Sequence, residues 1–455
     1  MWLRRVEGGR RHGALAAVLL AAWSTIAAAE PGSAPQATTT RYQLQNGLRV
    51  VLAPDRVTPG VSVVVRYDVG AANAPRGYRG LSHLLEHLTF RGSRHVAPLQ
   101  GMSILQELGA GFNATTELEA TEYYAQVSAP ALDTVLWLES ERMAFTLDRL
   151  DQAALDVERR IVDNEHRQRH TISKLLHQHW LRALYGEGHP FVEDPSAIPD
   201  LSEVTLRGVQ WFFQTAYRPD NATLVLVGQF DPPQALHSIE QYFGPIVPPP
   251  LARTSVQASA PRLCGMHRLG LSHASLFGHR LRITWPLPRA SSAPERASEN
   301  VLERRLASKL HGLLVERGVD VTNVNVFLNR FTTHSLLSVD LELHDKADAA
   351  VVEQVTLATA SELAQQPLSP QALRSIATNL ISSAIFNRED GLGRARKLAS
   401  GIDPDADTAA LRLIDNQQVL RAARPLGGPV LVVHMWPSKR EDGTTQIEED
   451  DNPCP

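Results

Sequence analysis

The chain has 455 residues, of which 43% are hydrophobic and 21% charged, and its net charge is −4. This length exceeds one ordinary domain and fits two or three, with enough apolar residues to bury a large core. The slightly negative charge excludes a broadly basic surface, so nucleic acid is not an expected partner. Beyond the N-terminal segment, no stretch approaches the roughly 20 apolar residues of a membrane span.

The first 29 residues have the pattern of a cleavable signal peptide. Arginines precede a short apolar run, and the alanines at 27–29 fit an A-x-A cleavage site. The same run could be an uncleaved anchor helix, although it is short for a span. We therefore expect cleavage near Ala29 and a periplasmic or secreted mature protein that no longer contacts the membrane.

Residues 30–40 are rich in Pro, Ala, Ser and Thr and are typical of a linker. A first domain, 41–246, begins with a predicted hairpin around Asn46-Gly47. Apolar periodicity then predicts strands over 61–70, within 112–127 and over 221–230. It predicts helices over 79–92, 99–108, 130–147 and 151–183, and a closing helix that ends at Gly244.

The Pro- and Ser-rich segment 247–262 predicts a linker before a second domain, 263–438. In that domain strands are predicted near 277–287, within 320–343 and at 429–436. Helices are predicted over 296–318, 347–366 and 369–389. The similar order of elements predicts an α+β fold of two homologous halves, each an antiparallel sheet covered by helices.

The last segment, 439–455, is acidic and is expected to be a disordered tail. It contains Cys454, and Cys264 is the other cysteine of the chain. Two cysteines make no disulfide framework, but they could form a single bridge in an oxidising compartment. Whether they pair is left open by the sequence.

His83, Glu86 and His87 form an H-x-x-E-H pattern in a predicted helix. The histidines are four residues apart, so both imidazoles can reach one cation from one helix face. Glu86 lies beside such a cation without having to bind it, which suits a general base that activates metal-bound water. A chance pattern on a surface helix, with an ordinary Glu–His pair, is the alternative.

Zinc in a catalytic site needs a third protein ligand and an open position for water. Glu158 and Glu165 are seven residues apart, or two helical turns, and therefore share a face. Glu165 could bind the metal, and Glu158 could lie beyond it as a supporting or auxiliary carboxylate. Glutamates at this spacing are also common on solvated helices.

Five segments in this order resemble the pitrilysin/insulinase family of zinc metallopeptidases, in particular its short bacterial and mitochondrial-processing-peptidase-like members. They are H-L-L-E-H-L-T-F-R-G-S at 83–93, G-F-N-A-T-T-E-L-E-A-T-E-Y-Y at 111–124, E-R-R-I-V-D-N-E at 158–165, H-P-F at 189–191 and Y-R-P-D-N-A-T-L-V-L-V-G at 217–228. The second half resembles the family in length and element order.

The resemblance implies one zinc ion per chain, with His83, His87 and Glu165 as ligands. It implies that Glu86 is the catalytic base, and it places Glu158 at the family's additional catalytic glutamate. It also implies that Asn113 and Ala114 lie on an edge strand that binds the backbone of a peptide substrate.

One departure from the family concerns the second half. In members that act alone or as identical pairs, that half supplies an Arg and a Tyr that grip the substrate. No tyrosine follows Tyr242 here, and Arg330 has no such partner. We therefore expect a dimer, and we consider a hetero-oligomer with a zinc-free homologous subunit.

The expected function is a zinc endopeptidase that hydrolyses short or unfolded peptides. A non-catalytic family subunit with a role in assembly is the alternative, and a structural zinc module is a third. Neither alternative needs Glu86 between the two histidines, so the sequence favours the peptidase.

Overall fold

The computed structural model describes residues 39–75, 78, 80–168, 171–192, 201–253, 258–344, 347–438 and 445–449. The expected signal peptide lies outside these residues. Both predicted halves belong to one compact unit, Thr39–Pro455, so contacts between the halves are contacts within that unit. In the described part of the chain, no helix combines the length and apolarity needed to cross a bilayer.

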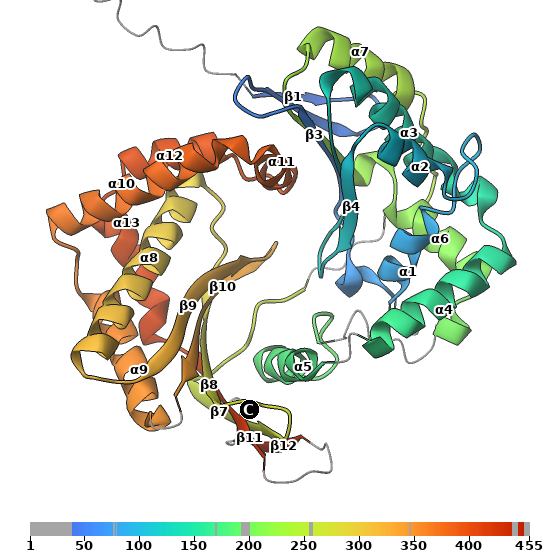
Figure 1. Cartoon of the computed structure of the whole chain (residues 1–455). Coiled ribbons are helices and arrows are strands. Elements are labelled where there is room, and N and C mark those ends of the chain that lie inside the picture. The colour runs from blue at the N-terminus through green and yellow to red at the C-terminus, as the bar shows by residue number, and fades with distance from the viewer. Residues whose placement is uncertain are drawn as a thin grey trace, which may run out of the picture. The chain divides into compact units, whose positions relative to one another are not determined.

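The first half contains a six-stranded sheet in the order β1-β2-β6-β3-β5-β4 (Figure 1). Its strands are β1 (Thr40–Gln43), β2 (Arg49–Pro54), β3 (Val61–Tyr67), β4 (Gly111–Thr116), β5 (Thr121–Val127) and β6 (Ala222–Gly228). Neighbouring strands are antiparallel except β2 and β6, which are parallel. β4 is therefore an edge strand, and among the described strands it pairs with β5 alone.

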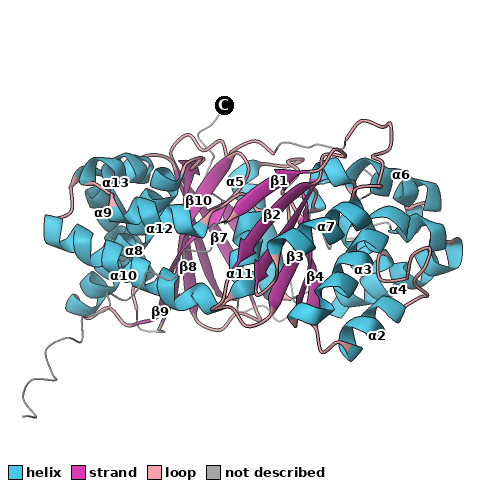
Figure 2. Ribbon diagram, turned by 90° about the horizontal axis from the view of Figure 1, so that it is seen from above, coloured by secondary structure: helices cyan, strands magenta, loops and turns pink. Residues whose placement is uncertain are grey.

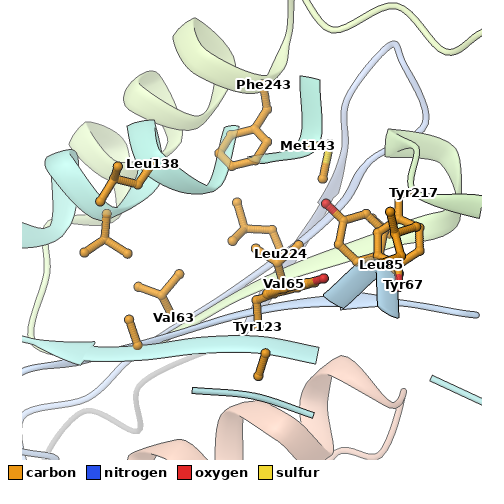
Figure 3. Close-up of a cluster of buried hydrophobic side chains, with 14 of the residues drawn as sticks. Val63, Val65, Tyr67, Leu85, Tyr123, Leu138, Met143, Tyr217, Leu224 and Phe243 are labelled. Carbon is orange, nitrogen blue, oxygen red and sulfur yellow. The ribbon is translucent and has the colours of Figure 1, made fainter. Parts of the chain in front are cut away.

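The helices of the first half are α1 (Leu81–Leu88), α2 (Gln100–Glu107), α3 (Leu132–Phe145), α4 (Gln152–Gln168), α5 (Ile172–Tyr185), α6 (Leu206–Ala216) and α7 (Pro232–Phe243). Apolar residues of α1, α3, α6 and α7 pack on the sheet face that carries Val63, Val65 and Tyr67 (Figure 3). The predicted single helix over 151–183 is wrong, because α4 and α5 are separate helices. The sequence pattern also missed α6.

The second half repeats this plan with the strand order β12-β7-β11-β8-β10-β9. Its strands are β7 (Met266–His273), β8 (His279–Pro288), β9 (Val321–Arg330), β10 (His334–Leu343), β11 (Val430–Pro437) and β12 (Gln446–Glu449). Its helices are α8 (Ala293–Glu316), α9 (Ala349–Gln365), α10 (Pro370–Phe386), α11 (Gly391–Ala399), α12 (Pro404–Arg412) and α13 (Asn416–Ala423). The sequence pattern missed β7 and the last three helices.

Strand for strand, the two sheets correspond. β4 and β9 each lie at one edge of their sheet, β5 and β10 lie next to them, and β2·β6 and β7·β11 are the parallel pairs. The predicted fold class of two homologous αβ halves is confirmed, with sheets that are mostly antiparallel and contain one parallel pair each.

The acidic C-terminal segment is not wholly disordered, contrary to the expectation. Gln446–Glu449 form β12, which pairs antiparallel with β7. The acidic composition predicted disorder. Composition contains no information about a nearby strand edge, and here the edge of β7 pairs with this segment through backbone hydrogen bonds. Cys264 takes part in a disulfide, and Cys454 lies outside the described residues.

One helix of each half packs on the sheet of the other half (Figure 2). Apolar residues of α5 pack with those of β7 and β11, and Trp180 Nε1 donates a hydrogen bond to Thr284 Oγ1 at 3.1 Å. Conversely, Ala395, Leu398 and Ala399 of α11 pack on the strands of the first sheet. The second half is therefore packed directly against the segment that follows α4.

Candidate metal and active site

The α1 helix presents the H-x-x-E-H residues because its opposite face is apolar. One stripe of leucines at helical spacing is buried in the core of the first half: Leu81, Leu84, Leu85 and Leu88. Burial of this stripe fixes the rotation of the helix and leaves His83, Glu86 and His87 half-buried on the other side. Gly80 precedes the helix with a φ of 76°, a left-handed conformation that favours glycine.

Glu165 of α4 lies against the two histidines of α1. Its Oε2 is 4.0 Å from His83 Nε2, and its Oε1 is 3.7 Å from His87 Nε2. One ligand atom from each of the three residues lies within 4.8 Å of the others, and in the described residues this is the one such group of His, Cys, Asp or Glu. Two imidazoles and one carboxylate form a donor set typical of catalytic zinc.

Glu158, two helical turns before Glu165 on α4, contacts the other side of the His87 ring. Its Oε2 is 3.1 Å from His87 Nδ1, and its Oε1 pairs with Arg91 Nε. A carboxylate on Nδ1 keeps the proton there and leaves Nε2 free to bind a cation. The contacts of Glu158 thus favour a role in orienting His87.

The acidic surroundings shift the pKa values of this pair. Burial alone would lower the pKa of His87, but the hydrogen bond with Glu158 and the charges of Glu165, Glu158 and Glu86 raise it. Burial alone would raise the pKa of Glu158, but His87 and Arg91 lower it. The negative potential that favours a proton on His87 also favours a metal cation between the three ligands.

Glu86 is held by the end of the edge strand. Thr116 Oγ1 donates a hydrogen bond of 2.6 Å to Glu86 Oε2. Thr116 is the last residue of β4, so this bond joins the predicted base to the strand predicted to bind substrate. The sequence does not indicate the roles of Thr116 and Arg91, because neither contact follows from spacing along one helix.

Three buried tyrosines lie beneath α1. Tyr67 and Tyr217 have ring centroids 4.8 Å apart beside Leu85, and Tyr123 packs edge-on against Tyr67 (Figure 3). Tyr123 accepts a hydrogen bond from Thr89 Oγ1 at 3.2 Å. Burial raises the pKa of all three phenols, so these side chains, which lie near Glu86, remain uncharged. This layer supports the helix without adding charge.

Asn113 and Ala114 lie in the middle of β4, on the edge of the first sheet. Asn113 is exposed, and its Oδ1 accepts a hydrogen bond of 2.9 Å from the Ala114 N–H. The geometry is compatible with strand addition at the position that the sequence predicted.

A cavity of about 650 Å³ lies next to the end of β4 and is lined from both halves. The first half contributes Glu117, Glu119 and residues of α5, and the second half contributes Arg330 and Arg396. Arg396 pairs with Glu117 and Glu122 across the halves at 3.2 and 2.6 Å. Charged groups of both signs therefore face this space.

Comparison with known proteins gives two adjoining family matches. Residues 49–188 match the model described as insulinase (peptidase family M16), and residues 203–380 match the peptidase M16 inactive domain. Together the two matches span most of the chain. The chain belongs to peptidase family M16.

Individual M16 relatives agree with this assignment. The zinc protease PqqE of Helicobacter pylori is 30% identical over 204 residues, which are 44% of this chain and 45% of that protein. The chain thus matches less than half of the length of that relative. Among solved structures, a protease from Helicobacter pylori has a TM-score of 0.77 at 20% identity, over 88% of this chain and all of that one. The first half of the periplasmic protease PqqL from Escherichia coli has a TM-score of 0.72 at 17% identity, over 87% and 91%.

The M16 fold lets the two halves be compared at the metal position. Thr116 ends β4 and contacts Glu86, whereas Arg330 ends the corresponding strand β9 and contacts α8. Arg330 Nε donates to Glu299 at 2.7 Å and Arg330 Nη2 to Asn300 at 2.8 Å. The last residue of the edge strand thus contacts a helix carboxylate through a hydroxyl in the first half and through a guanidinium in the second half. This arrangement agrees with the match to an inactive M16 domain.

Proposed function

We propose that this M16 protein is a zinc-dependent endopeptidase. The observation that carries the proposal is the convergence of His83, His87 and Glu165, with ligand atoms within 4.8 Å, beside Glu86 on the same helix face. The two sequence segments that supply these residues are almost 80 positions apart, and only packing of α1 on α4 brings them together. A structural metal module would have no use for the adjacent Glu86.

The donor set fits zinc by chemistry and reach. Zinc binds imidazole nitrogen and carboxylate oxygen at about 2.0–2.2 Å, so two ligands of one ion lie roughly 3–4 Å apart. The Glu165 oxygens are 4.0 and 3.7 Å from the histidine nitrogens, which agrees with this spacing. A zinc ion in this position would polarise the scissile carbonyl and make hydroxide available near neutral pH.

The side chains of the chain supply the remaining steps. Glu86 would accept the proton of the attacking water and pass it to the leaving amine. Thr116 would orient the Glu86 carboxylate through their 2.6 Å hydrogen bond. Glu158 would hold His87 in the tautomer whose Nε2 faces the ligand site.

The proposed substrate is an extended peptide, short or unfolded. The free edge of β4, with Asn113 and Ala114, supports this choice because strand addition recognises an extended backbone rather than a sequence. A folded protein presents few such segments.

We also propose that the active form is a dimer, with a zinc-free homologous subunit as the second partner. The absence of tyrosine after Tyr242 supports this, because this second half cannot supply the expected Arg–Tyr grip. Arg330, the arginine considered for substrate binding, instead donates hydrogen bonds to Glu299 and Asn300. A non-catalytic assembly subunit remains the competing function, and export to the periplasm is proposed from the N-terminal pattern.

The test compares Glu86→Gln with the wild type for zinc content and peptide cleavage. We expect about one zinc per chain in both proteins and a loss of at least about 100-fold in kcat for the variant, because a general base contributes about 10²–10⁴-fold. His87→Ala should lose both zinc and activity. Glu107→Gln, on the exposed face of α2, is the control and should behave as wild type. Equal activity of Glu86→Gln and wild type would refute the mechanism.

A further inference from the structure

The turn between β4 and β5, residues 117–120, is bound to the loop that precedes α1. The Ala71 N–H donates to Glu117 O at 2.8 Å, and the Ala72 N–H donates to Leu118 O at 2.9 Å. A Cβ on Gly70 would lie 2.3 Å from Glu117 O, so the backbones are in close contact. Ser82 of α1 completes the link, since its Oγ donates to Gly70 O at 2.7 Å.

The same turn is bound on its other side by the second half. The Glu119 carboxylate accepts hydrogen bonds from the Thr332 N–H at 2.8 Å and from Thr332 Oγ1 at 2.5 Å. Thr332 lies in the turn between β9 and β10, 213 residues along the chain. We call this pair of hydrogen bonds the Glu119–Thr332 latch.

Aromatic contacts surround the latch. Phe191 packs on Phe331 with ring centroids 4.9 Å apart, and Leu118 belongs to the same apolar cluster. This apolar cluster includes residues of both turns. The latch itself is largely exposed, and exposed charged contacts add little to global stability. Its effect should therefore be on the local position of the turn.

We infer that Glu119 is a positioning residue through which the second half fixes the candidate base Glu86. The inference rests on the proposed peptidase function. Thr116, which bonds to Glu86, is three residues before Glu119 and directly precedes the latched turn. If the turn moves, both the Thr116 hydroxyl and the edge of β4 move relative to α1. A small misplacement of a catalytic group is enough to slow a reaction severely.

Arg396 also binds this turn, through Glu117, but it is a poorer probe. It pairs with Glu122 as well and lies over the Tyr124 ring at 5.6 Å. Replacing Arg396 would therefore disturb the packing of α11 on the first sheet. Replacement of Glu119 removes the two hydrogen bonds of the latch directly.

The experiment compares Glu119→Ala, Glu119→Gln, Thr332→Val and the double variant Glu119→Ala/Thr332→Val in the full chain. The control is Arg41→Ala. Arg41 lies on β1, at the opposite edge of the first sheet, and its pair with Asp403 at 3.0 Å is another exposed contact between the halves. Each protein is measured for amide hydrogen exchange in β4 and the turn, zinc content, melting temperature, kcat and KM.

For Glu119→Ala we expect amide exchange in 111–120 to rise about tenfold or more, because the local opening free energy falls. We expect kcat/KM to fall about tenfold, chiefly through kcat, with zinc retained and the melting temperature within about 3 °C of wild type. Glu119→Gln keeps one acceptor oxygen and should recover most of kcat. Adding Thr332→Val to Glu119→Ala should cause no further loss, since the two residues share one contact.

Unchanged exchange in 111–120 together with kcat within about twofold of wild type would overturn the inference. An equal effect of Arg41→Ala would also overturn the inference. Global unfolding of Glu119→Ala would overturn it too, because it would indicate a structural role only. If the wild type cleaves no peptide, the proposed function fails while exchange still decides the latch. The two failures are thus distinguishable.

Discussion

Both nitrogens of the His87 imidazole face a carboxylate: Nε2 faces Glu165 and Nδ1 faces Glu158. Glu158 is 4% exposed and also neutralises Arg91, so it is a fixed support rather than a mobile carboxylate. A fixed carboxylate of this kind holds the orientation of the ring and hence the direction of the metal-binding nitrogen. The same logic gives Thr116 its role at Glu86.

Replacing Glu158 by Gln should weaken zinc binding about 10–100-fold without abolishing it, because an outer support of a ligand typically contributes that much. Chelator competition on the purified protein measures the change. Asp156→Asn, on the exposed side of the same helix, should bind zinc as wild type does. Wild-type zinc affinity in Glu158→Gln would show that His87 needs no such support.

His334 gives the protein a predictable response to acid. It is 1% exposed, and its Nε2 is 2.7 Å from the Tyr185 hydroxyl. Burial, with a smaller effect of His189, lowers the pKa of His334 to about 4. Since the unfolded chain takes up this proton near pH 6.5 and the folded chain does not, the free energy of unfolding should fall between about pH 6.5 and 4.

The expected loss attributable to His334 approaches about 3 kcal/mol at pH 4, from a shift of roughly two to three pKa units. Denaturant unfolding across this pH range measures it. His334→Gln should be less stable at pH 7, because a buried hydrogen bond changes, but its stability should fall less steeply in acid. His311→Gln, an exposed change on α8, should keep the wild-type pH slope. An unchanged slope in His334→Gln would contradict the prediction.

At the scale of elements, the two exchanged helices join the halves. α4 carries Glu165, and α5, which follows it closely, is packed on the second sheet. The position of the third candidate ligand therefore depends on the second half, although none of the described residues of that half is a candidate ligand. α11 makes the reciprocal contact with the first sheet.

Gly391, the first residue of α11, tests this contact. A Cβ there would lie 2.3 Å from Thr58 Cγ2 and 3.0 Å from Ser62 Oγ, so Gly391→Ala should destabilise the protein by about 1–3 kcal/mol through overpacking. Gly312→Ala in α8 is the matched change, since a Cβ there meets no atom within 4 Å. It should stabilise the helix by roughly 0.5–1 kcal/mol. Thermal unfolding of both variants measures the difference, and two stabilising changes would disprove the close contact.

At the scale of the whole molecule, one half carries the candidate chemistry and the other half shapes it. In the second half Arg330 pairs with Glu299, and no tyrosine follows Tyr242 that could bind a peptide. We predict that the purified chain alone cleaves peptides slowly. A homologous subunit with the Arg–Tyr pair and without H-x-x-E-H should raise the rate about tenfold or more, through better placement of the substrate. A full rate from the chain alone would eliminate the need for such a partner.

The sequence by itself determined what depends on neighbours along the chain. The leucine spacing of α1, the four-residue separation of His83 and His87, and the alternation in most strands are local patterns, so they predicted the helix face and the two-half plan. Composition alone misjudged β12, because its order comes from pairing with β7.

Only the tertiary structure decided which distant groups meet. The sequence proposed Glu165 as a ligand, and the structure shows how closely it approaches the histidines. The contacts of Thr116 with Glu86 and of Thr332 with Glu119 join segments whose spacing does not indicate them. The physical reason is that these approaches depend on how buried faces of separate helices and strands pack. Packing is set by the sum of many apolar contacts rather than by the residues next to each site.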